Sequence, residues 1–429
     1  MAHFGVLSYK GSGHLNPLIA LSKELMVRRH RVTFFLPGEL EDQIRQQGLG
    51  FSPIDISYSS NLTSWRSSPN LGLHEGRIGE MRTKLERIDH EMGAYLREYP
   101  RALRAADVDA LLMGEITLTG PTVAEMLRLP YFVISTSIPH NFGWGAPESI
   151  WPERFRHEQA HDKLLEVSIF HMKGPVRRAL DRHRMRLGLR SIREIRATFP
   201  ELAHMTQWPK CLDLPRPGLP ANFYYTGPYA DAGSRVAVPF PWEKLDGRPL
   251  VYASLGTTKR ADVAVLQRVA EACADQTLQL VITLGGRHGP ALFDSFPGNA
   301  LVVPNAPQLE LLKRAEVVIT HAGPNTVLET LQQGKPMLAL PMALDQPAVA
   351  AHLARLGAAE VLPPGRRSVG DIRAALLKVR NDSGYRKAAE ALQAKLSVLH
   401  GAVQAANIIE TKLAGVQEFD VVRRSMTVI

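Results

Sequence analysis

Short apolar segments alternate with amphipathic segments from the N-terminus onward. Phe4 to Ser8 reads as a buried strand, Pro17 to Arg29 has leucines at helical spacing, and Arg31 to Leu36 returns to strand. The same order is predicted again at Ala110 to Met113, Pro121 to Leu129 and Tyr131 to Ser135. Two such units favour a parallel sheet covered by helices as the first domain.

The second half of the chain repeats this order after a segment rich in proline and glycine. Gly227 to Pro249 contains the breakers expected of a linker, so we place a domain boundary there. Apolar strands are then predicted at Leu250 to Leu255, Gln279 to Leu284, Ala300 to Val303, Val317 to Thr320 and Met337 to Leu340. The expected fold class is α/β, with two facing, doubly wound, Rossmann-like domains at residues 1–228 and 229–429. Ligands are expected in the interdomain cleft, and the last helices are candidates to pack back on the first domain.

The composition is that of a globular protein and gives no reason to expect a nucleic-acid-binding function. A chain of 429 residues can form two cores, and its 45% hydrophobic and 22% charged residues are typical of a globular protein. Many ordinary enzymes carry a charge such as its +9, so no nucleic-acid partner is expected. Residues 151–200 hold twelve Lys and Arg against six Asp and Glu. This basic region is interpreted as a solvated helical face, as acceptor-pocket lining, or as a contact with an anionic membrane surface.

The cysteine count and the length of the apolar runs indicate in which cellular compartment the protein is expected. Cys211 and Cys273 are too few for a disulfide framework or a zinc site, which favours a reducing environment. No secretion signal is visible, and no apolar run approaches the ~18 to 20 residues that cross a bilayer. We expect a cytoplasmic protein, with peripheral contact at the inner face of the membrane as an option.

The most informative segment runs from Val317 to Glu329 and reads as a strand that turns directly into a helix. Gly323 can cap this helix, and Pro324 suits its first turn, where a missing N–H is not needed. The free N–H groups and positive dipole end would bind a diphosphate in the cleft without a cation. Three side chains beside this turn add donors: His321, Asn325 and Thr326.

Acid and amide side chains follow at positions suited to sugar hydroxyls. Glu329 lies one helical turn beyond Asn325, where its carboxylate could bind both hydroxyls of a ribose. Asp345 and Gln346 follow the strand that ends at Leu340, at the carboxyl edge of the predicted sheet. Each also fits a plain structural role, as an exposed helix acid or a turn residue.

These segments resemble the donor-binding signature of the UDP-glycosyltransferase superfamily. The resemblance rests on Asn305-Ala306-Pro307-Gln308, His321 to Thr326, Glu329 and Asp345-Gln346, with the spacing kept from His321 through Gln346. It implies the two-domain GT-B fold. It also implies that Ala306 meets the uracil, Gln308 and Glu329 the ribose, His321, Asn325 and Thr326 the phosphates, and Asp345 with Gln346 the transferred sugar. Ser254 matches a further phosphate-side position.

One position departs from this pattern. The superfamily usually has an aromatic residue, commonly Trp, stacked on the uracil where this chain has Asn305. Stacking there would be weaker or supplied elsewhere, which bears on how strongly uridine is preferred.

The segment from Gly11 to Pro17 resembles the acceptor-side loop of the same superfamily, in which the histidine, here His14, is the catalytic base. A histidine has a pKa close to working pH and can remove the proton of an acceptor hydroxyl. A dinucleotide-binding glycine motif is the alternative. Asn16 occupies its third glycine position, however, and no ribose-binding acid closes the second strand, which argues against a nicotinamide enzyme.

The superfamily's histidine normally pairs with an aspartate that ends a later strand, and Gly114 occupies that position here. Glu115 is adjacent and is predicted to orient His14, with a chance surface glutamate as the alternative. Asp107-Val108-Asp109 spells the DxD metal motif of a different glycosyltransferase fold, but it precedes its strand and is interpreted as a coincidence. We expect no metal, and no cofactor beyond the UDP-sugar co-substrate.

Together these residues imply an inverting, metal-independent glycosyltransferase that moves a hexose, by resemblance glucose, from a UDP-sugar to a small hydroxylated acceptor. Asp213 to Arg216, Asn222 to Pro228 and Asp345 to Ala350 look most like the bacterial carotenoid (zeaxanthin) branch, which implies a lipophilic acceptor. A macrolide, flavonoid or terpenoid glycosyltransferase is the close alternative. A UDP-sugar epimerase would have no use for the His14 loop. A catalytically impaired UDP-sugar-binding partner protein stays open because of the missing aspartate.

Overall fold

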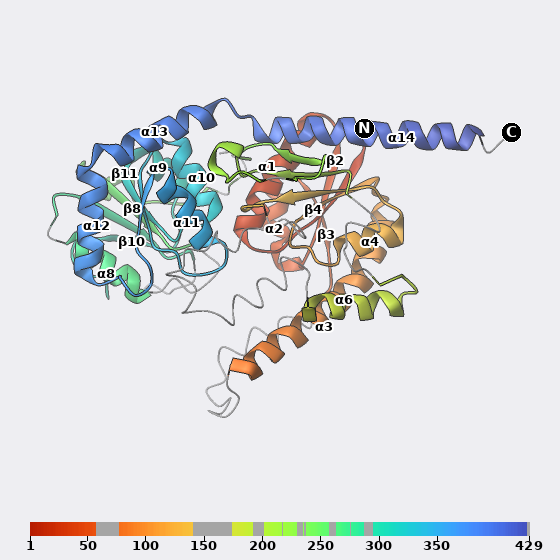
Figure 1. Ribbon diagram of the computed structural model, residues 1–429, viewed down its shortest axis with the longest axis horizontal. Coiled ribbons are helices and arrows are strands. Elements are labelled where there is room, and N and C mark those ends of the chain that lie inside the picture. The colour runs from red at the N-terminus through yellow and green to blue at the C-terminus, as the bar shows by residue number, and fades with distance from the viewer. Residues whose placement is uncertain are drawn as a thin grey trace.

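The structure is a computed structural model that describes residues 1–56, 77–139, 174–191, 201–216, 218–229, 235, 237–256, 263–274, 276–286 and 295–426. For residues 77–82 and 417–426 the description is limited to the backbone. The strands of the described residues form two parallel sheets that lie side by side, each with its own helices (Figure 1).

The first sheet has the order β3-β2-β1-β4-β5-β6-β7, with every neighbouring pair parallel. Its strands are β1 (His3–Leu7), β2 (Arg31–Leu36), β3 (Gly50–Pro53), β4 (Ala110–Gly114), β5 (Tyr131–Ser135), β6 (Ala203–Thr206) and β7 (Phe223–Tyr225). The strand order reverses between β1 and β4. A crevice for ligands opens at such a switch point, outside the carboxyl ends of the strands.

The second sheet follows the same rule with the order β10-β9-β8-β11-β12-β13, again all parallel. Its strands are β8 (Leu250–Ser254), β9 (Gln279–Thr283), β10 (Leu301–Val303), β11 (Ala315–Thr320), β12 (Met337–Ala339) and β13 (Ala359–Val361). The switch point lies between β8 and β11. The interval between β7 and β8 supports the domain division after residue 228 that we propose.

Helices cover both faces of each sheet. In the first domain they are α1 (Ser12–Val27), α2 (Glu41–Arg45), α3 (Arg77–Ala106), α4 (Gly120–Leu127) and α6 (Gly174–Arg186). In the second they are α8 (Val263–Cys273), α9 (Gln308–Arg314), α10 (Pro324–Gln332), α11 (Gln346–Arg355), α12 (Val369–Asn381) and α13 (Ser383–Ser397), and α14 (Gly401–Met426) follows. Successive residues of the inner strands enter opposite cores. Leu112 and Ile134 pack with α1, whereas Met113 and Val133 pack with α3.

The predicted α/β class and strand positions are confirmed, but α1 begins earlier than predicted, at Ser12 instead of Pro17. Gly11 has extended backbone, and its carbonyl accepts the N–H groups of His14 (2.9 Å) and Leu15 (3.0 Å). Pro17 therefore lies inside the helix. Because proline has no N–H, it cannot donate to the carbonyl of Gly13, four residues earlier.

The chain passes between the domains after β7 and again between α13 and α14, and these two crossings touch. Gly227 has a φ of +90°, and a Cβ there would lie 2.9 Å from Leu399 Cβ. A Cβ on Gly401 would overlap the carbonyl oxygens of Gly227 and Pro228. The closeness of the two segments therefore depends on glycine at both points.

Beyond this point α14 runs along the first domain (Figure 1). Its buried residues Ala405, Ala406, Ile409 and Leu413 join the core under α1. Arg28 at the end of α1 donates to Glu410 (2.6 Å), which also lies 3.0 Å from Nε2 of His30. The last helix is thus part of the first domain's core. No helix among the described residues is long and apolar enough to cross a membrane.

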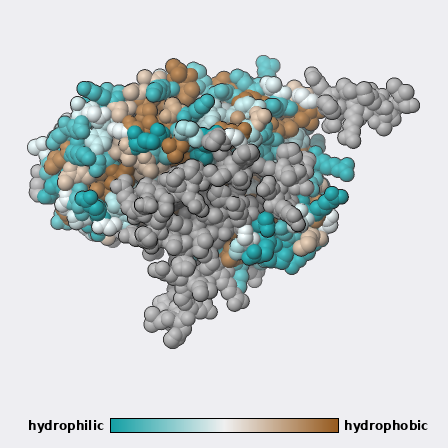
Figure 2. Space-filling view, in the orientation of Figure 1, coloured by the Kyte–Doolittle hydropathy of each residue, from teal (hydrophilic) through white to brown (hydrophobic). Residues whose placement is uncertain are grey.

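Part of the basic region at 151–200 lies outside the described residues, and α6 is its described portion. Arg184 is fully buried and pairs with Glu125 of α4 (2.8 Å), which anchors α6. The opposite side carries exposed arginines and a Met185 that is 60% exposed. Figure 2 shows hydrophilic residues gathered where α6 lies.

Candidate active site

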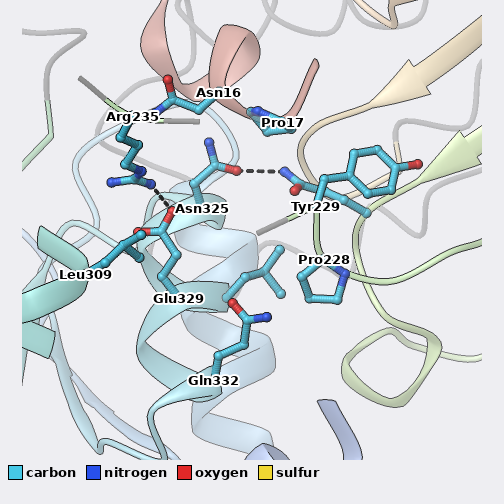
Figure 3. Close-up of a pocket in the computed structure, with 11 residues that line it drawn as sticks. Asn16, Pro17, Pro228, Tyr229, Arg235, Leu309, Asn325, Glu329 and Gln332 are labelled. Atoms are coloured by element: carbon cyan, nitrogen blue, oxygen red, sulfur yellow. Dashed lines mark hydrogen bonds and ion pairs between the residues drawn. The ribbon is translucent and has the colours of Figure 1, made fainter. Parts of the chain in front are cut away.

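A cavity of about 1080 Å³ lies where the carboxyl ends of both sheets meet. One wall comes from the first domain and includes His14, Thr136 and Ser137. The other wall contains nearly all predicted donor-side residues: Ser254, Ala306, Gln308, His321, Gly323, Asn325, Thr326, Asp345 and Gln346. Glu329 lines a small adjoining pocket together with Asn325 (Figure 3). Residues from distant parts of the sequence therefore meet in one cleft.

His14 lies in the first turn of α1, on the wall of this cavity. Its Nδ1 atom is 2.9 Å from Oγ1 of Thr136, and the ring of Tyr9 meets the imidazole edge-to-face at 5.7 Å. Burial lowers the pKa of His14 to about 4, so the imidazole is neutral near pH 7. When Nδ1 carries the proton and donates to Thr136, Nε2 has the free lone pair of a general base.

Glu115 does not occupy the position predicted for it. Its carboxylate accepts a hydrogen bond from Ser135 Oγ (2.5 Å) and lies 3.8 Å from Nε2 of the buried His204. Side chains alternate along a strand, so residue 115 follows Met113 to the α3 face of the sheet, whereas His14 lies on the α1 face. A residue one position away faces the opposite side. The structure thus corrects the prediction that Glu115 orients His14, and gives that contact to Thr136.

Helix α10 begins as predicted, with Gly323 as N-cap and Pro324 in the first turn. Its N-cap residue is a glycine, which has no side chain to cap the first N–H groups. The His321 ring packs against the backbone of both Gly256 and Gly323. A Cβ on Gly256 would lie 2.6 Å from Nε2 of His321, and a Cβ on Gly323 would overlap the same ring. Burial lowers the pKa of His321 to about 4, so this side chain is a neutral hydrogen-bonding group. The helix N-terminus, not a charged histidine, supplies the positive potential.

Glu329 lies in α10, one helical turn after Asn325, and both of its carboxylate oxygens accept hydrogen bonds. Oε2 accepts from Gln308 Nε2 (2.7 Å), and Oε1 accepts from the guanidinium of Arg235, an interaction drawn in Figure 3. Burial raises the pKa of Glu329, whereas Arg235 and Gln308 oppose that rise. Tyr252 completes the group with a hydrogen bond to Gln308 Oε1 (3.2 Å). Gln308 and Glu329, the two residues predicted to bind a ribose, are therefore hydrogen-bonded to each other, with an arginine from the linker beside them.

Asp345 ends the turn after β12 as the N-cap of α11, and Gln346 is the first residue of that helix. Oε1 of Gln346 accepts the N–H groups of Met342 (2.8 Å) and Ala343 (3.0 Å), which fixes the turn. Asp345 accepts a hydrogen bond from Ser137 Oγ of the first domain. Burial raises the pKa of Asp345, and this hydrogen bond opposes the rise. An acid suited to sugar hydroxyls thus bridges the two walls.

Asn305, at the position where the superfamily usually has an aromatic residue, lines this cavity, as do Ala306 and Trp242. The Asn305 amide packs close to Gly286, whose φ of +73° favours glycine. Trp242 comes from the linker, and the guanidinium of Arg314 lies 4.4 Å from the centre of its ring. An aromatic ring is therefore present on the wall of the same cavity as Asn305.

The DxD string lies at the opposite end of β4 from the cleft. Oδ2 of Asp109 accepts the N–H of His3 (2.7 Å), and Asp107 has a φ of +51° in the turn before the strand. These contacts describe a structural turn. Among the described residues no group of three or more His, Cys, Asp or Glu side chains is arranged to hold a metal ion.

Comparison with known proteins agrees with this arrangement. Residues 208–402 match the family "UDP-glucoronosyl and UDP-glucosyl transferase", and residues 7–137 match the "Glycosyltransferase family 28 N-terminal domain". The zeaxanthin glucosyltransferase of Pseudescherichia vulneris is 30% identical over 425 residues, covering 97% of this chain and 99% of that protein. The chain belongs to the UDP-glycosyltransferase family. It is an enzyme that uses a nucleotide sugar as donor.

Two further relatives bear on the fold and the branch. The zeaxanthin glucosyltransferase of Pantoea ananas is 28% identical, covering 82% of this chain and 83% of that protein. The solved structure of CalG4, the calicheamicin glycosyltransferase, superposes with a TM-score of 0.74 at 21% identity, covering 96% of this chain and 98% of that one. This glycosyltransferase therefore has the GT-B fold.

Five residues at the cleft of this glycosyltransferase were not predicted from the sequence: Thr136, Ser137, Gln207, Arg235 and Trp242. Three of them follow the ends of β5 and β6, where the rule for parallel sheets gives a signal that could have found them. The other two come from the linker, where no periodic pattern marks a functional side chain.

Proposed function

We propose that this enzyme transfers glucose from UDP-glucose to a hydroxyl of a lipophilic acceptor of the carotenoid type, with inversion at the anomeric carbon. The observation that carries the proposal is a neutral His14 on one wall of a single cavity, with the N-terminus of α10 on the other. The acceptor class is supported by the two zeaxanthin glucosyltransferases that match most of the chain.

The proposed reaction is one in-line displacement. Nε2 of His14 takes the hydroxyl proton as the acceptor oxygen forms a bond to the anomeric carbon, and the bond from that carbon to the β-phosphate oxygen breaks. UDP leaves toward the N–H groups of α10 with His321 and Thr326, while Glu329 and Gln308 bind the ribose. An α-linked donor thus gives a β-glycoside. Asp345 and Gln346 are assigned to the hydroxyls of the transferred sugar.

No step of this proposal needs a metal ion. The charge that develops on the diphosphate faces the N–H groups of the α10 first turn, which follow a glycine N-cap, and the positive end of the helix dipole. Macrolide, flavonoid and terpenoid acceptors remain alternatives within the same mechanism.

We also propose a peripheral contact of α6 with an anionic membrane surface, through which a lipophilic acceptor would be reached. Arg178, Arg182 and Arg186 recur at helical spacing on its exposed side, beside the exposed Met185. Basic residues flanking an apolar side chain match the charge and polarity of a lipid headgroup region.

The test is an acceptor screen with UDP-glucose, read as UDP release and as glycoside formed. Zeaxanthin in mixed micelles should give acceptor-dependent UDP release and a β-glucoside, with macrolide, flavonoid and terpenoid alcohols as comparison. Turnover with one of those and none with zeaxanthin would replace the acceptor class. Thermal stabilisation by UDP without release on any acceptor would indicate a binding protein that has lost catalysis.

A further inference from the structure

The side chain of Asn325 is committed to the first domain at both of its polar atoms. Nδ2 donates to the carbonyl of Gly13 (2.7 Å), and Oδ1 accepts from Nε2 of Gln207 (2.6 Å). Figure 3 shows Asn325 pointing from α10 toward Asn16 and Pro17 of α1, with its hydrogen bond dashed. A residue at the start of the donor helix thus joins the two walls of the cleft. We call Gly13, Gln207 and Asn325 the interdomain clasp.

The carbonyl that Asn325 meets is available because of Pro17. In a regular helix the carbonyl of Gly13 would accept the N–H of residue 17, and proline has none. This carbonyl is exposed at the cleft, so it is free to accept a donor from the second domain. The amide of Asn325 supplies that donor.

Gln207 connects the interdomain clasp to His14 through Thr136. It is 3% exposed, and besides Asn325 its amide nitrogen donates to the carbonyl of Thr136 (2.5 Å). Thr136 in turn contacts Nδ1 of His14 through its hydroxyl (2.9 Å). A chain of hydrogen bonds therefore leads from α10 through the ends of β6 and β5 to the imidazole.

We propose that Gln207 and Pro17 are positioning residues that hold His14 in register with the donor helix. Neither lies among the residues assigned to the chemistry. They act through Asn325 and Thr136, so that the base on one domain faces the anomeric carbon held by the other. The inference rests on the proposed role of His14 and is independent of which acceptor is used.

The experiment measures kcat, donor KM and the Kd of UDP for Gln207→Leu, Asn325→Ala, the double variant and Pro17→Ala. Gln207→Leu should lower kcat roughly 10- to 100-fold, the scale for a small misplacement of reacting groups, with the Kd of UDP changed less than twofold. The double variant should lose no more than the worse single variant, because both break one chain of contacts. Pro17→Ala restores the helical N–H and should lower kcat roughly 3- to 10-fold by competing for Gly13.

Gln279→Leu is the matched control, because Gln279 is also a buried glutamine bonded to backbone, at Lys244 (2.7 Å) and Asp246 (3.0 Å). It should lower Tm and leave kcat unchanged. If Gln207→Leu does not fold, Pro17→Ala carries the test, since it removes no buried polar side chain. Amide exchange at residues 12–16 gives a readout without turnover, and it should be faster in Gln207→Leu than in wild type. The proposal would be overturned if Gln207→Leu left both kcat and amide exchange unchanged, or if it weakened UDP binding alone. It would also be overturned if the losses in kcat of the two single variants multiplied in the double variant. A wild type without transferase activity would instead count against the proposed function.

Discussion

Nδ1 of His14 lies 2.9 Å from the hydroxyl of Thr136, a residue 122 positions away at the end of β5. The contact fixes one nitrogen of the imidazole and leaves the other toward the cavity. His14→Ala should lower transfer at least 100-fold, the usual scale for a general base, and leave UDP affinity nearly unchanged. Thr136→Val keeps the shape and removes the hydroxyl, so kcat should fall by roughly 5-fold, the factor of one hydrogen bond of about 1 kcal/mol. Steady-state kinetics with UDP titration measures both. A His14→Ala enzyme retaining a tenth of wild-type kcat would exclude His14 as the base.

The lowered pKa of His14 predicts the acid limb of the pH profile. Only the neutral imidazole is a base, and its fraction is lost as pH falls through about 4. The acid limb of kcat/KM should therefore lie well below the pH 6.5 of an ordinary histidine. Because the folded pKa is depressed, stability is also lost as pH falls from 6.5 toward 4, so Tm must be followed alongside.

Gly114→Asp should move that acid limb upward. Residue 114 shares the α1 face with Leu112, and a Cβ there meets only Thr117 Oγ1 at 3.7 Å and Ser8 Oγ at 3.9 Å. A carboxylate on this face would favour the imidazolium and raise the pKa of His14. Gly114→Asn is the uncharged control. A shift of the limb in both variants, or in neither, would contradict the electrostatic explanation.

Glu115→Ala should affect stability more than chemistry. The change removes the carboxylate that accepts the Ser135 hydroxyl. Ser135 Oγ keeps its contact with His204 Nε2 (2.7 Å), and His204 keeps Glu201 at 3.7 Å, so the loss should be about 1 kcal/mol of unfolding free energy, that of one hydrogen bond. The kcat of the folded enzyme should stay within about threefold of wild type. Glu115→Gln keeps an acceptor and should lose less stability. A large fall in kcat with an unchanged Tm would restore the catalytic role predicted from the sequence.

Chelation should leave the rate unchanged. The diphosphate is assigned to the first turn of α10 and to neutral side chains, which do not require a cation. Initial rates are compared in EDTA and in added Mg²⁺ or Mn²⁺. Activity that disappears with EDTA and returns with metal would contradict the assignment and direct attention back to Asp107 and Asp109.

The basic side of α6 should bind anionic vesicles. Replacing Arg178, Arg182 and Arg186 by Gln removes about 3 kcal/mol of attraction at about 1 kcal/mol per residue, so partitioning onto phosphatidylserine vesicles should fall roughly 100-fold. Sedimentation with vesicles measures this. The matched control replaces three basic residues of the second domain, Lys313, Arg366 and Lys378. An equal loss in both variants would indicate net charge alone.

The placement of the proposed donor-side residues around the start of α10 was predictable because its signal is local. A strand, a glycine and a proline specify where α10 begins, and residues from His321 to Glu329 follow within three turns. The acceptor half depends on contacts between distant strand ends, such as His14 with Thr136 or Ser137 with Asp345, and a single sequence carries no record of such pairs. Glu115 was assigned by adjacency to Gly114, and a shift of one residue along a strand reverses the face.

The contact between Gly227 and Gly401 sets how the cleft can move. Both passages of the chain between the domains go through this one spot, where neither residue has room for a side chain. We expect a joint of this kind to permit rotation of one sheet away from the other and to resist sliding, because sliding would shear two backbone segments already in contact. The walls of the cavity can then part to release a product and close again with α10 and α1 meeting at the same residues.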